Sequence, residues 1–197
     1  MTTGWKYVDG YKFYFGTDGK MVQDVDKLIG KQSSYRITVN RVKCQVTVYA
    51  ANETGNYCIP VKTFTCSVGL PGTPTPTGTF TTPAKYRWHT LMGPSYGQYC
   101  TRIVGGVLFH SVAGSNMTSH NLSAGNYNML GQPASHGCIR TCVADAKWVY
   151  ENCNGSTLRV FDGKYSADEC YKGPLGRRPL TPLRGSKTFD PTDPDYQ

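Results

Sequence analysis

The chain has 197 residues and a formal net charge of +8. Only 17% of its residues are charged, whereas Gly, Tyr and Thr are plentiful. This composition is typical of a β-rich domain with many turns and argues against a helical bundle. The basic residues are scattered without interleaved aromatics, so nucleic acid is not an expected partner, and no apolar run approaches the roughly 20 residues that span a bilayer.

The first segment, residues 4–25, is dense in aromatic residues and glycines. Asp9-Gly10 and Asp18-Gly19 are dipeptides that favour tight turns, so we expect a short β-hairpin here. The segment resembles one cell-wall-binding repeat of the choline-binding type, a unit that normally stacks with further copies to bury its apolar face. The alternative is a single hairpin packed on the main domain.

The start of the chain lacks the charged and apolar regions of a secretory signal. A lone wall-binding repeat also suggests that the natural protein continues upstream. We therefore expect an exported, extracellular protein associated with the cell wall, whose export signal is not part of this chain.

Alternation of apolar and polar residues predicts strands over residues 35–40, 44–50 and 58–68. The Pro/Gly/Thr-rich residues 70–78 are predicted to form a loop, because proline does not fit a central strand. An apolar stretch over residues 102–112 is predicted to be one central strand that carries His110 at its far end.

Residues 115–130 are polar and are predicted to form a long loop. One helix is predicted to follow, with Thr141 as its N-cap, Asp145 in its first turn and Asn154-Gly155 as its stop signal. A closing strand is expected over residues 157–162, and an irregular, proline-rich tail completes the chain.

Eight cysteines are present, and Cys138 has the most reactive setting, within the sequence SHGCIR at residues 135–140. A thiolate is a strong nucleophile that needs a positive environment and a base, and His110 upstream is a candidate base. Gly137 allows a sharp backbone turn, so that the amides of Gly137 and Cys138 would face an oxyanion, and the predicted helix N-terminus would favour the thiolate. The cysteine and histidine spacing is not that of a zinc site, so neither a metal nor another cofactor is expected.

Three motifs follow one another along the chain: PTGTF at residues 76–80, FHS at residues 109–111 and LGQPASHGCIR at residues 130–140. Together they resemble the L,D-transpeptidase (YkuD-type) family over residues 35–162. The resemblance implies a mainly β fold, a β-sandwich with one short helix following the catalytic cysteine. It also implies cleavage after the third residue of a peptidoglycan stem tetrapeptide and transfer of the acyl group, through cysteine, to an amine of a neighbouring stem.

Carried onto this chain, the resemblance makes Cys138 the nucleophile and His110 the general base. It gives Ser111 the role of orienting His110 through its backbone carbonyl, and it places His136 and Gly137 in the oxyanion hole. Ser135, Arg140 and Tyr96 are the expected substrate-binding residues. Two roles remain open for Arg140: it either holds the local turn or contacts a substrate carboxylate.

Cys142 stands where many relatives carry other residues. We expect it to lie near Cys138, one helical turn away, where a disulfide would silence the enzyme under oxidising conditions. Residues 1–27 are predicted to be the wall-binding hairpin, residues 28–170 the catalytic domain and residues 171–197 the tail.

The expected function is formation of 3→3 cross-links between peptidoglycan stem peptides. Carbapenem-type β-lactams should acylate the cysteine, and the positive charge should favour anionic cell-wall polymers as partners. Two alternatives remain open at this point. One is an L,D-carboxypeptidase or wall endopeptidase with the same thiol mechanism, and the other is a non-catalytic wall-binding module.

Overall fold

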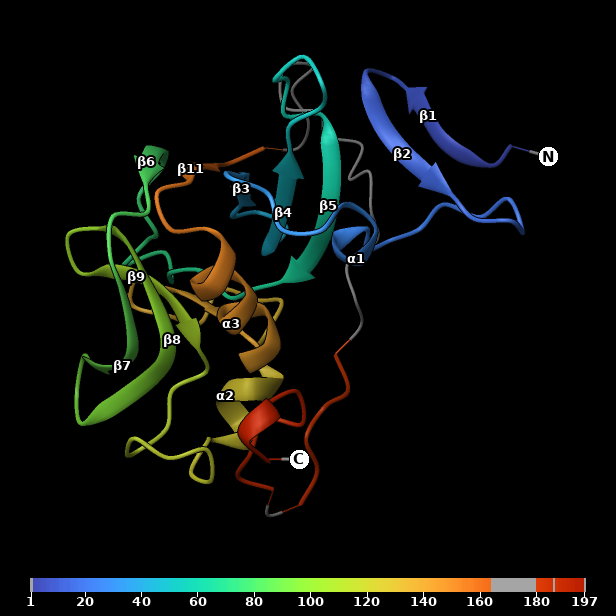
Figure 1. Cartoon of the computed structure of the whole chain (residues 1–197). Coiled ribbons are helices and arrows are strands. Elements are labelled where there is room, and N and C mark those ends of the chain that lie inside the picture. The colour runs from blue at the N-terminus through green and yellow to red at the C-terminus, as the bar shows by residue number, and fades with distance from the viewer. Residues whose placement is uncertain (1, 164–179, 186, 197) are drawn as a thin grey trace.

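A computed structural model describes residues 2–163, 180–185 and 187–196. One sheet has five strands in the order β5-β4-β3-β11-β6, in which only β11 and β3 run parallel (Figure 1). Its members are β3 (Arg36–Asn40), β4 (Gln45–Ala50), β5 (Ile59–Thr65), β6 (Gly78–Thr81) and β11 (Thr157–Phe161). The strands predicted around residues 35–50, 58–68 and 157–162 are therefore confirmed.

A second sheet has four strands in the order β10-β9-β8-β7, with β10 parallel to β9. Its members are β7 (Lys85–Leu91), β8 (Ser95–Val104), β9 (Val107–Ser111) and β10 (Ile139–Thr141). The prediction of a single strand over residues 102–112 was wrong. The chain reverses at Gly105-Gly106, where the positive φ of Gly105 (52°) makes a tight turn, so the apolar stretch forms a hairpin.

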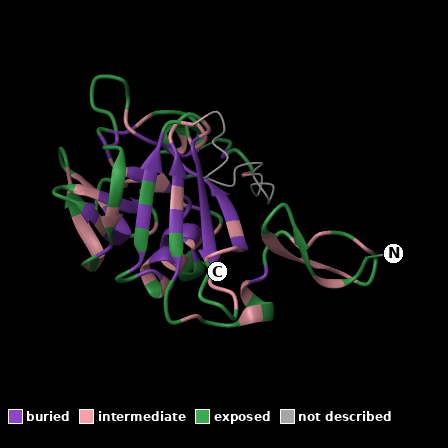
Figure 2. Ribbon diagram, turned by 90° about the horizontal axis from the view of Figure 1, so that it is seen from above, coloured by how far each residue is buried: buried purple, intermediate pink, exposed green. Residues whose placement is uncertain are grey.

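The main hydrophobic core draws buried residues from both sheets and from helix α3 (Val143–Asn152). Ile37 and Val39 of β3 meet Phe109 of β9 and Val149 of α3 in this cluster. Figure 2 shows buried positions concentrated along the central strands, as expected for a two-layer β fold. The mainly β class is confirmed.

Helix α3 begins one residue later than predicted, because Cys142 rather than Thr141 is its N-cap. Thr141 instead ends the short strand β10, which separates the cysteine motif from the helix. Asp145 does lie in the first turn of the helix, as predicted.

The predicted N-terminal hairpin is present as β1 (Gly4–Val8) and β2 (Tyr11–Phe15), followed by the short helix α1 (Asp26–Ile29). It packs on the five-stranded sheet beside β5 (Figure 1). The Lys12 amide donates to the Cys58 carbonyl over 2.9 Å, and the rings of Tyr11 and Tyr49 lie 6.1 Å apart. The hairpin thus has a defined contact with the rest of the molecule.

The predicted loop over residues 115–130 contains a further short helix, α2 (Ala124–Asn128), which Ser123 caps by accepting from the Asn126 amide. The predicted tail lies partly outside the described residues. Its described part includes a short 3-10 turn, η2 (Pro194–Tyr196), and buries Leu183, Asp190 and Asp193 against the domain. None of the described helices is long and apolar enough to cross a membrane.

Candidate active site

The parallel pairing of β9 and β10 brings the cysteine motif beside the histidine. Arg140 pairs with His110 and Ile139 with Phe109. Paired residues on adjacent strands share a face and side chains alternate along a strand, so Cys138, Arg140 and His110 all belong to one face. Cys138 is therefore a diagonal neighbour of His110, with Cα atoms roughly 8 Å apart from the strand spacing and rise.

His110 is held in one tautomer inside the sheet. Its side chain is only 2% exposed, and its Nδ1 donates to the carbonyl oxygen of Ser111 over 2.5 Å. A carbonyl only accepts, so Nδ1 carries the proton and Nε2 is left with a free lone pair. Ser111 thus makes, through its backbone, the contact that the sequence resemblance implied.

Burial decides the charge of the imidazole. Removal from water lowers the pKa of His110 to about 4, with the nearby Arg140 charge acting in the same direction and the Ser111 hydrogen bond opposing both. His110 is therefore neutral at pH 7 and is able to accept a proton.

The Cys138 thiol is half-buried and lies 3.7 Å from the Gly106 carbonyl oxygen. Burial raises the pKa of Cys138, while a backbone hydrogen bond from Leu108 and the charge of Arg140 partly offset that rise. The resting pair is consequently a neutral thiol beside a neutral imidazole.

The expectation that the helix N-terminus favours the Cys138 thiolate was wrong. Strand β10 lies between Cys138 and α3, and the first amides of the helix already have partners. The Val143 amide donates to Asp190 over 2.7 Å, and the Ala144 amide donates to the Thr192 hydroxyl over 3.0 Å. The positive end of the helix is thereby satisfied by the C-terminal segment.

The turn before Cys138 is tightly bonded. Ser135 is fully buried, and its hydroxyl accepts from the Gly137 amide over 3.1 Å while donating to the Cys138 carbonyl over 2.5 Å. The Thr75 hydroxyl donates to the Gly137 carbonyl over 2.8 Å. Gly137 has a φ of 118°, a conformation that favours glycine. Because the Gly137 amide is engaged by Ser135, its use in an oxyanion hole requires this bond to be shared or released.

Arg140 holds the same turn from the other side. Its Nη1 donates to the Ala134 carbonyl over 2.9 Å, and among the described residues its Nε has no hydrogen-bond partner. Burial lowers the pKa of Arg140, with Cys138 acting in the opposite direction. The turn-holding role is thus present in the geometry, and the unpartnered Nε is itself buried.

The other two predicted residues lie nearer the surface. His136 is exposed within the turn, next to the buried Gly137. Tyr96 is half-buried on β8, and its backbone exchanges two hydrogen bonds of 2.9 Å with Gly114.

Cys142 does not approach Cys138, contrary to the sequence-based expectation. The intervening residues are an extended strand, which separates the two Cα atoms by about 13 Å, too far for a disulfide. The Cys142 thiol donates to the Asp145 carboxylate over 3.0 Å. Cys142 is the N-cap residue of α3 by position, and its thiol bonds within the first turn of the helix.

Strand β8 supplies residues that sequence reasoning missed. Cys100, by extension of the Thr101–Phe109 pair, lies opposite His110, and burial raises its pKa to about 12, with Cys138 contributing in the same direction. Gly97 passes so close to the imidazole that an added Cβ would lie 2.9 Å from His110 Nδ1. No local pattern marks these residues, because their relation to His110 arises only from strand pairing.

Among the described residues, no group of three or more His, Cys, Asp or Glu side chains is placed to hold a metal ion. The site therefore consists of a thiol, an imidazole and hydrogen-bonding backbone, the parts needed for covalent acyl transfer.

Comparison with known proteins agrees with this chemistry. The YkuD model, which describes the L,D-transpeptidase catalytic domain, matches residues 34–179. The Bacillus subtilis (strain 168) protein YciB, provisionally named an L,D-transpeptidase, is 42% identical over 83 residues, which are 40% of this chain and 41% of that protein.

Solved structures share the fold. A fused Zn-dependent amidase/peptidase/peptidoglycan-binding domain-containing protein from Clostridium acetobutylicum ATCC 824 is 26% identical with a TM-score of 0.51, covering 65% of this chain and 52% of that one. An L,D-transpeptidase from Mycobacterium smegmatis is 22% identical with a TM-score of 0.52, covering 65% and 58%. The L,D-transpeptidase LdtMt1, solved in complex with imipenem, is 20% identical with a TM-score of 0.52, covering 65% and 59%.

The chain spans between 41% and 59% of the length of these relatives. The match of the family model nevertheless extends over most of the chain and includes His110 on β9 and Cys138 just before β10. The chain belongs to the YkuD family of L,D-transpeptidase catalytic domains.

Proposed function

We propose that the chain is a cysteine-dependent L,D-transpeptidase that forms 3→3 cross-links between peptidoglycan stem peptides. The proposal is supported by the β9–β10 register, which pairs Ile139, the residue after Cys138, with Phe109, the residue before His110, and by the hydrogen bond from His110 Nδ1 to the Ser111 carbonyl. The family membership supplies the substrate class.

In the first half-reaction, Cys138 Sγ attacks the carbonyl carbon of the third residue of a donor stem, which is bonded to the D-alanine nitrogen. The thiol proton passes to Nε2 of His110, because both groups are neutral at rest and no preformed thiolate is available. The tetrahedral oxyanion is stabilised by backbone amides of the 136–138 turn. When the C–N bond breaks, the imidazolium returns the proton to the leaving D-alanine amine, which leaves a thioester on Cys138.

In the second half-reaction, a side-chain amine of a neighbouring stem attacks the thioester carbonyl. His110 Nε2 accepts a proton from that amine, and Cys138 leaves and recovers its proton. The new amide is the 3→3 cross-link. Arg140, Tyr96 and Ser135 are the proposed substrate-binding residues, and His136 and Gly137 are the proposed oxyanion residues.

If water instead of the amine attacks the same thioester, the tripeptide is released and the enzyme acts as an L,D-carboxypeptidase. Incubating the protein with a stem tetrapeptide, with and without an acceptor tetrapeptide, separates the two reactions by product mass. A cross-linked dimer identifies the transferase, whereas a tripeptide alone, even at high acceptor concentration, would replace the transfer proposal with hydrolysis.

The cysteine mechanism is tested by exposing the intact chain to imipenem, the ligand in the LdtMt1 structure. We expect one covalent adduct, located on Cys138 by peptide mass spectrometry and absent from the Cys138→Ala variant. Cys58→Ala is the matched control, since Cys58 is also partly accessible but lies near the N-terminal hairpin. An adduct that persists in Cys138→Ala, or none in the wild type, would contradict the mechanism.

We further propose that residues 1–27 act as a wall-binding hairpin, residues 28–170 as the catalytic domain and residues 171–197 as a tail, in a protein exported to the cell wall. The aromatic hairpin and the net charge of +8 support this. Binding of the full chain to purified cell walls should weaken as salt is added, because screening reduces attraction to anionic wall polymers. Binding that is insensitive to salt would contradict a role for the charge.

A further inference from the structure

The C-terminal segment, residues 188–196, lies beside α2 in Figure 1. It also bonds to the sheet that carries His110, through Asp195 with Arg87 on β7 and Asp193 with Gln98 on β8. We call it the C-terminal strap. Its Thr188 carbonyl accepts from the Leu122 amide over 2.7 Å, and Asp190 caps α3 through the Val143 amide. A third contact, made by Asp193, leads toward the active site.

Asp193 is 1% exposed, and its carboxylate accepts from Gln98 Nε2 over 2.6 Å. The same amide is occupied at its other end, because Gln98 Oε1 accepts from Arg87 Nη1 over 2.9 Å. Gln98 is 4% exposed. A buried amide with both ends engaged has one favoured orientation, since any other would leave buried polar atoms unpaired.

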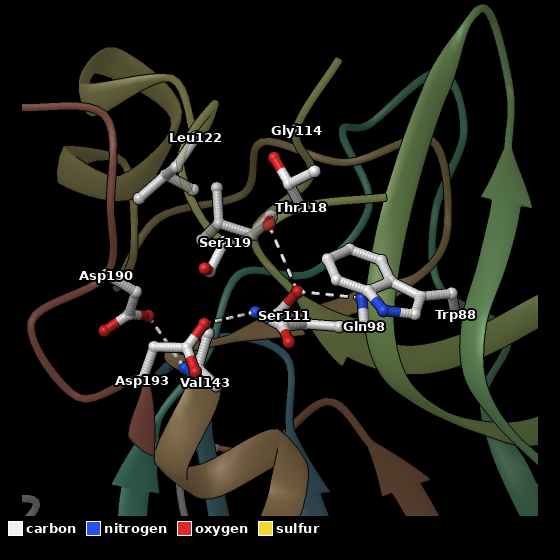
Figure 3. Close-up of a pocket in the computed structure, with 11 residues that line it drawn as sticks. Trp88, Gln98, Ser111, Gly114, Thr118, Ser119, Leu122, Val143, Asp190 and Asp193 are labelled. Atoms are coloured by element: carbon white, nitrogen blue, oxygen red, sulfur yellow. Dashed lines mark hydrogen bonds between the residues drawn. The ribbon is translucent and has the colours of Figure 1, made fainter. Parts of the chain in front are cut away.

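The Gln98 backbone continues the chain of contacts. Its amide donates to the Ser111 hydroxyl over 3.0 Å, and that hydroxyl donates to the Val112 carbonyl over 3.2 Å. Figure 3 shows Asp193, Gln98 and Ser111 converging on one side of a small recess of about 10 Å³. The Ser111 carbonyl then accepts from His110 Nδ1.

A second contact links the same stretch of β8 to the imidazole. Gly97, which precedes Gln98, lies against the His110 ring so closely that a Cβ there would fall 2.9 Å from Nδ1. A shift of Gln98 therefore moves both the partner of Ser111 and the wall of the imidazole site.

We propose that Gln98 and Asp193 are positioning residues for His110, which act through Ser111 to hold the imidazole with its proton on Nδ1 and its Nε2 free for Cys138. This inference rests on the proposed function, in which His110 is the base. Neither residue touches the reacting atoms. The strap thus contributes to catalysis from outside the sequence motif.

A second buried aspartate of the C-terminal strap, Asp190, serves as a control for Asp193. Asp190 lies three residues from Asp193 and is also buried, yet its carboxylate accepts from the amides of Val143 and Thr192 and so caps α3. Asp190→Ala should therefore lower stability without changing the imidazole, whereas Asp193→Ala should change both.

The experiment measures two quantities in wild type, Asp193→Ala, Asp193→Asn and Asp190→Ala. One is the rate constant of Cys138 acylation by imipenem, and the other is the His110 tautomer by ¹⁵N NMR of labelled imidazole. We expect Asp193→Ala to slow acylation by about 10- to 100-fold and to populate the Nε2-protonated form, because small misplacements of catalytic groups cost that much. Asp193→Asn keeps an acceptor for Gln98 and should restore most of the rate.

If Asp193→Ala does not fold, Gln98→Met tests the same idea, because it keeps the side-chain length and removes both amide contacts. Wild-type acylation and tautomer in a folded variant would overturn the inference. Equal losses in Asp193→Ala and Asp190→Ala with an unchanged tautomer would also overturn it, in favour of a purely structural strap. If the wild type itself is not acylated, the proposed function fails, and the tautomer measurement still decides the role of the strap.

Discussion

At the scale of single residues, the chemistry is governed by burial. Cys138 and His110 are both removed from water, which raises the pKa of the thiol and lowers that of the imidazole. The pair therefore differs from a thiolate–imidazolium pair, and proton transfer belongs to the attack step. Ser135, Gly137 and Arg140 fix the backbone around the sulfur by internal hydrogen bonds.

A pH prediction follows for His110. Its pKa is about 4 in the folded chain and about 6.5 when unfolded, so the unfolded state binds more protons between these values. The stabilisation by neutral His110 is complete above pH 6.5 and is lost as the pH falls through 4. By denaturant titration, wild type should lose about 3 kcal/mol between pH 7 and pH 4 from this group, and His110→Gln should lack that component. The exposed His120→Gln should retain it, and equal pH profiles for wild type and His110→Gln would contradict the assignment.

At the scale of elements, strands β8, β9 and β10 assemble the site, and the close approach of β8 to β9 is its tightest point. Gly97→Ala would place a methyl group 2.9 Å from His110 Nδ1 and 3.0 Å from its Cβ. We expect a loss of about 1–3 kcal/mol in stability, as for other overpacked sites, together with slower acylation by imipenem. Gly72→Ala is the control, because nothing lies within 4 Å of an added Cβ there. Unchanged acylation in Gly97→Ala would show that the ring has room to move.

Helix α3 depends on a cap supplied from far along the chain. Asp190→Ala removes the acceptor of the Val143 amide and should lower the free energy of unfolding by about 1–2 kcal/mol, the usual cost of losing a cap. Glu151→Ala, which breaks only the exposed Lys147–Glu151 pair of the same helix, should cost no more than about 0.5 kcal/mol. Thermal or denaturant unfolding measures both, and equal costs would argue against the cap.

The elements also show how far the sequence leads. The SHGCIR motif, the strands around residues 35–65 and the helix after residue 142 follow from local patterns, and all are present. The β8–β9 hairpin was missed because its turn glycines lie within one apolar stretch, where the alternation of apolar and polar residues does not mark the end of a strand. Gln98 and Asp193 were missed because residues 95 positions apart meet only in the fold.

At the scale of the whole molecule, the N-terminal hairpin and the catalytic sheet occupy opposite ends (Figure 1). Tyr11 contacts the buried Tyr49, whereas Tyr7 on the same hairpin is exposed. Tyr11→Ala should release the hairpin and speed tryptic cleavage after Lys20, while imipenem acylation stays within about twofold of wild type, because local opening is confined to weakly packed units. Val8→Ala, at another exposed position of the same hairpin, should behave like wild type. Acylation that falls with hairpin release would show that the two ends are coupled.

The burial of the Cys138 thiol also affects how the protein resists oxidation when no substrate is bound. Peroxides attack ionised sulfur, so a cysteine that remains protonated is oxidised slowly. Because burial raises the pKa of Cys138, the sulfur stays uncharged until an acyl donor and His110 act on it together. Cys138 is therefore not a permanently activated nucleophile, and its sulfur resists oxidation while no substrate is bound.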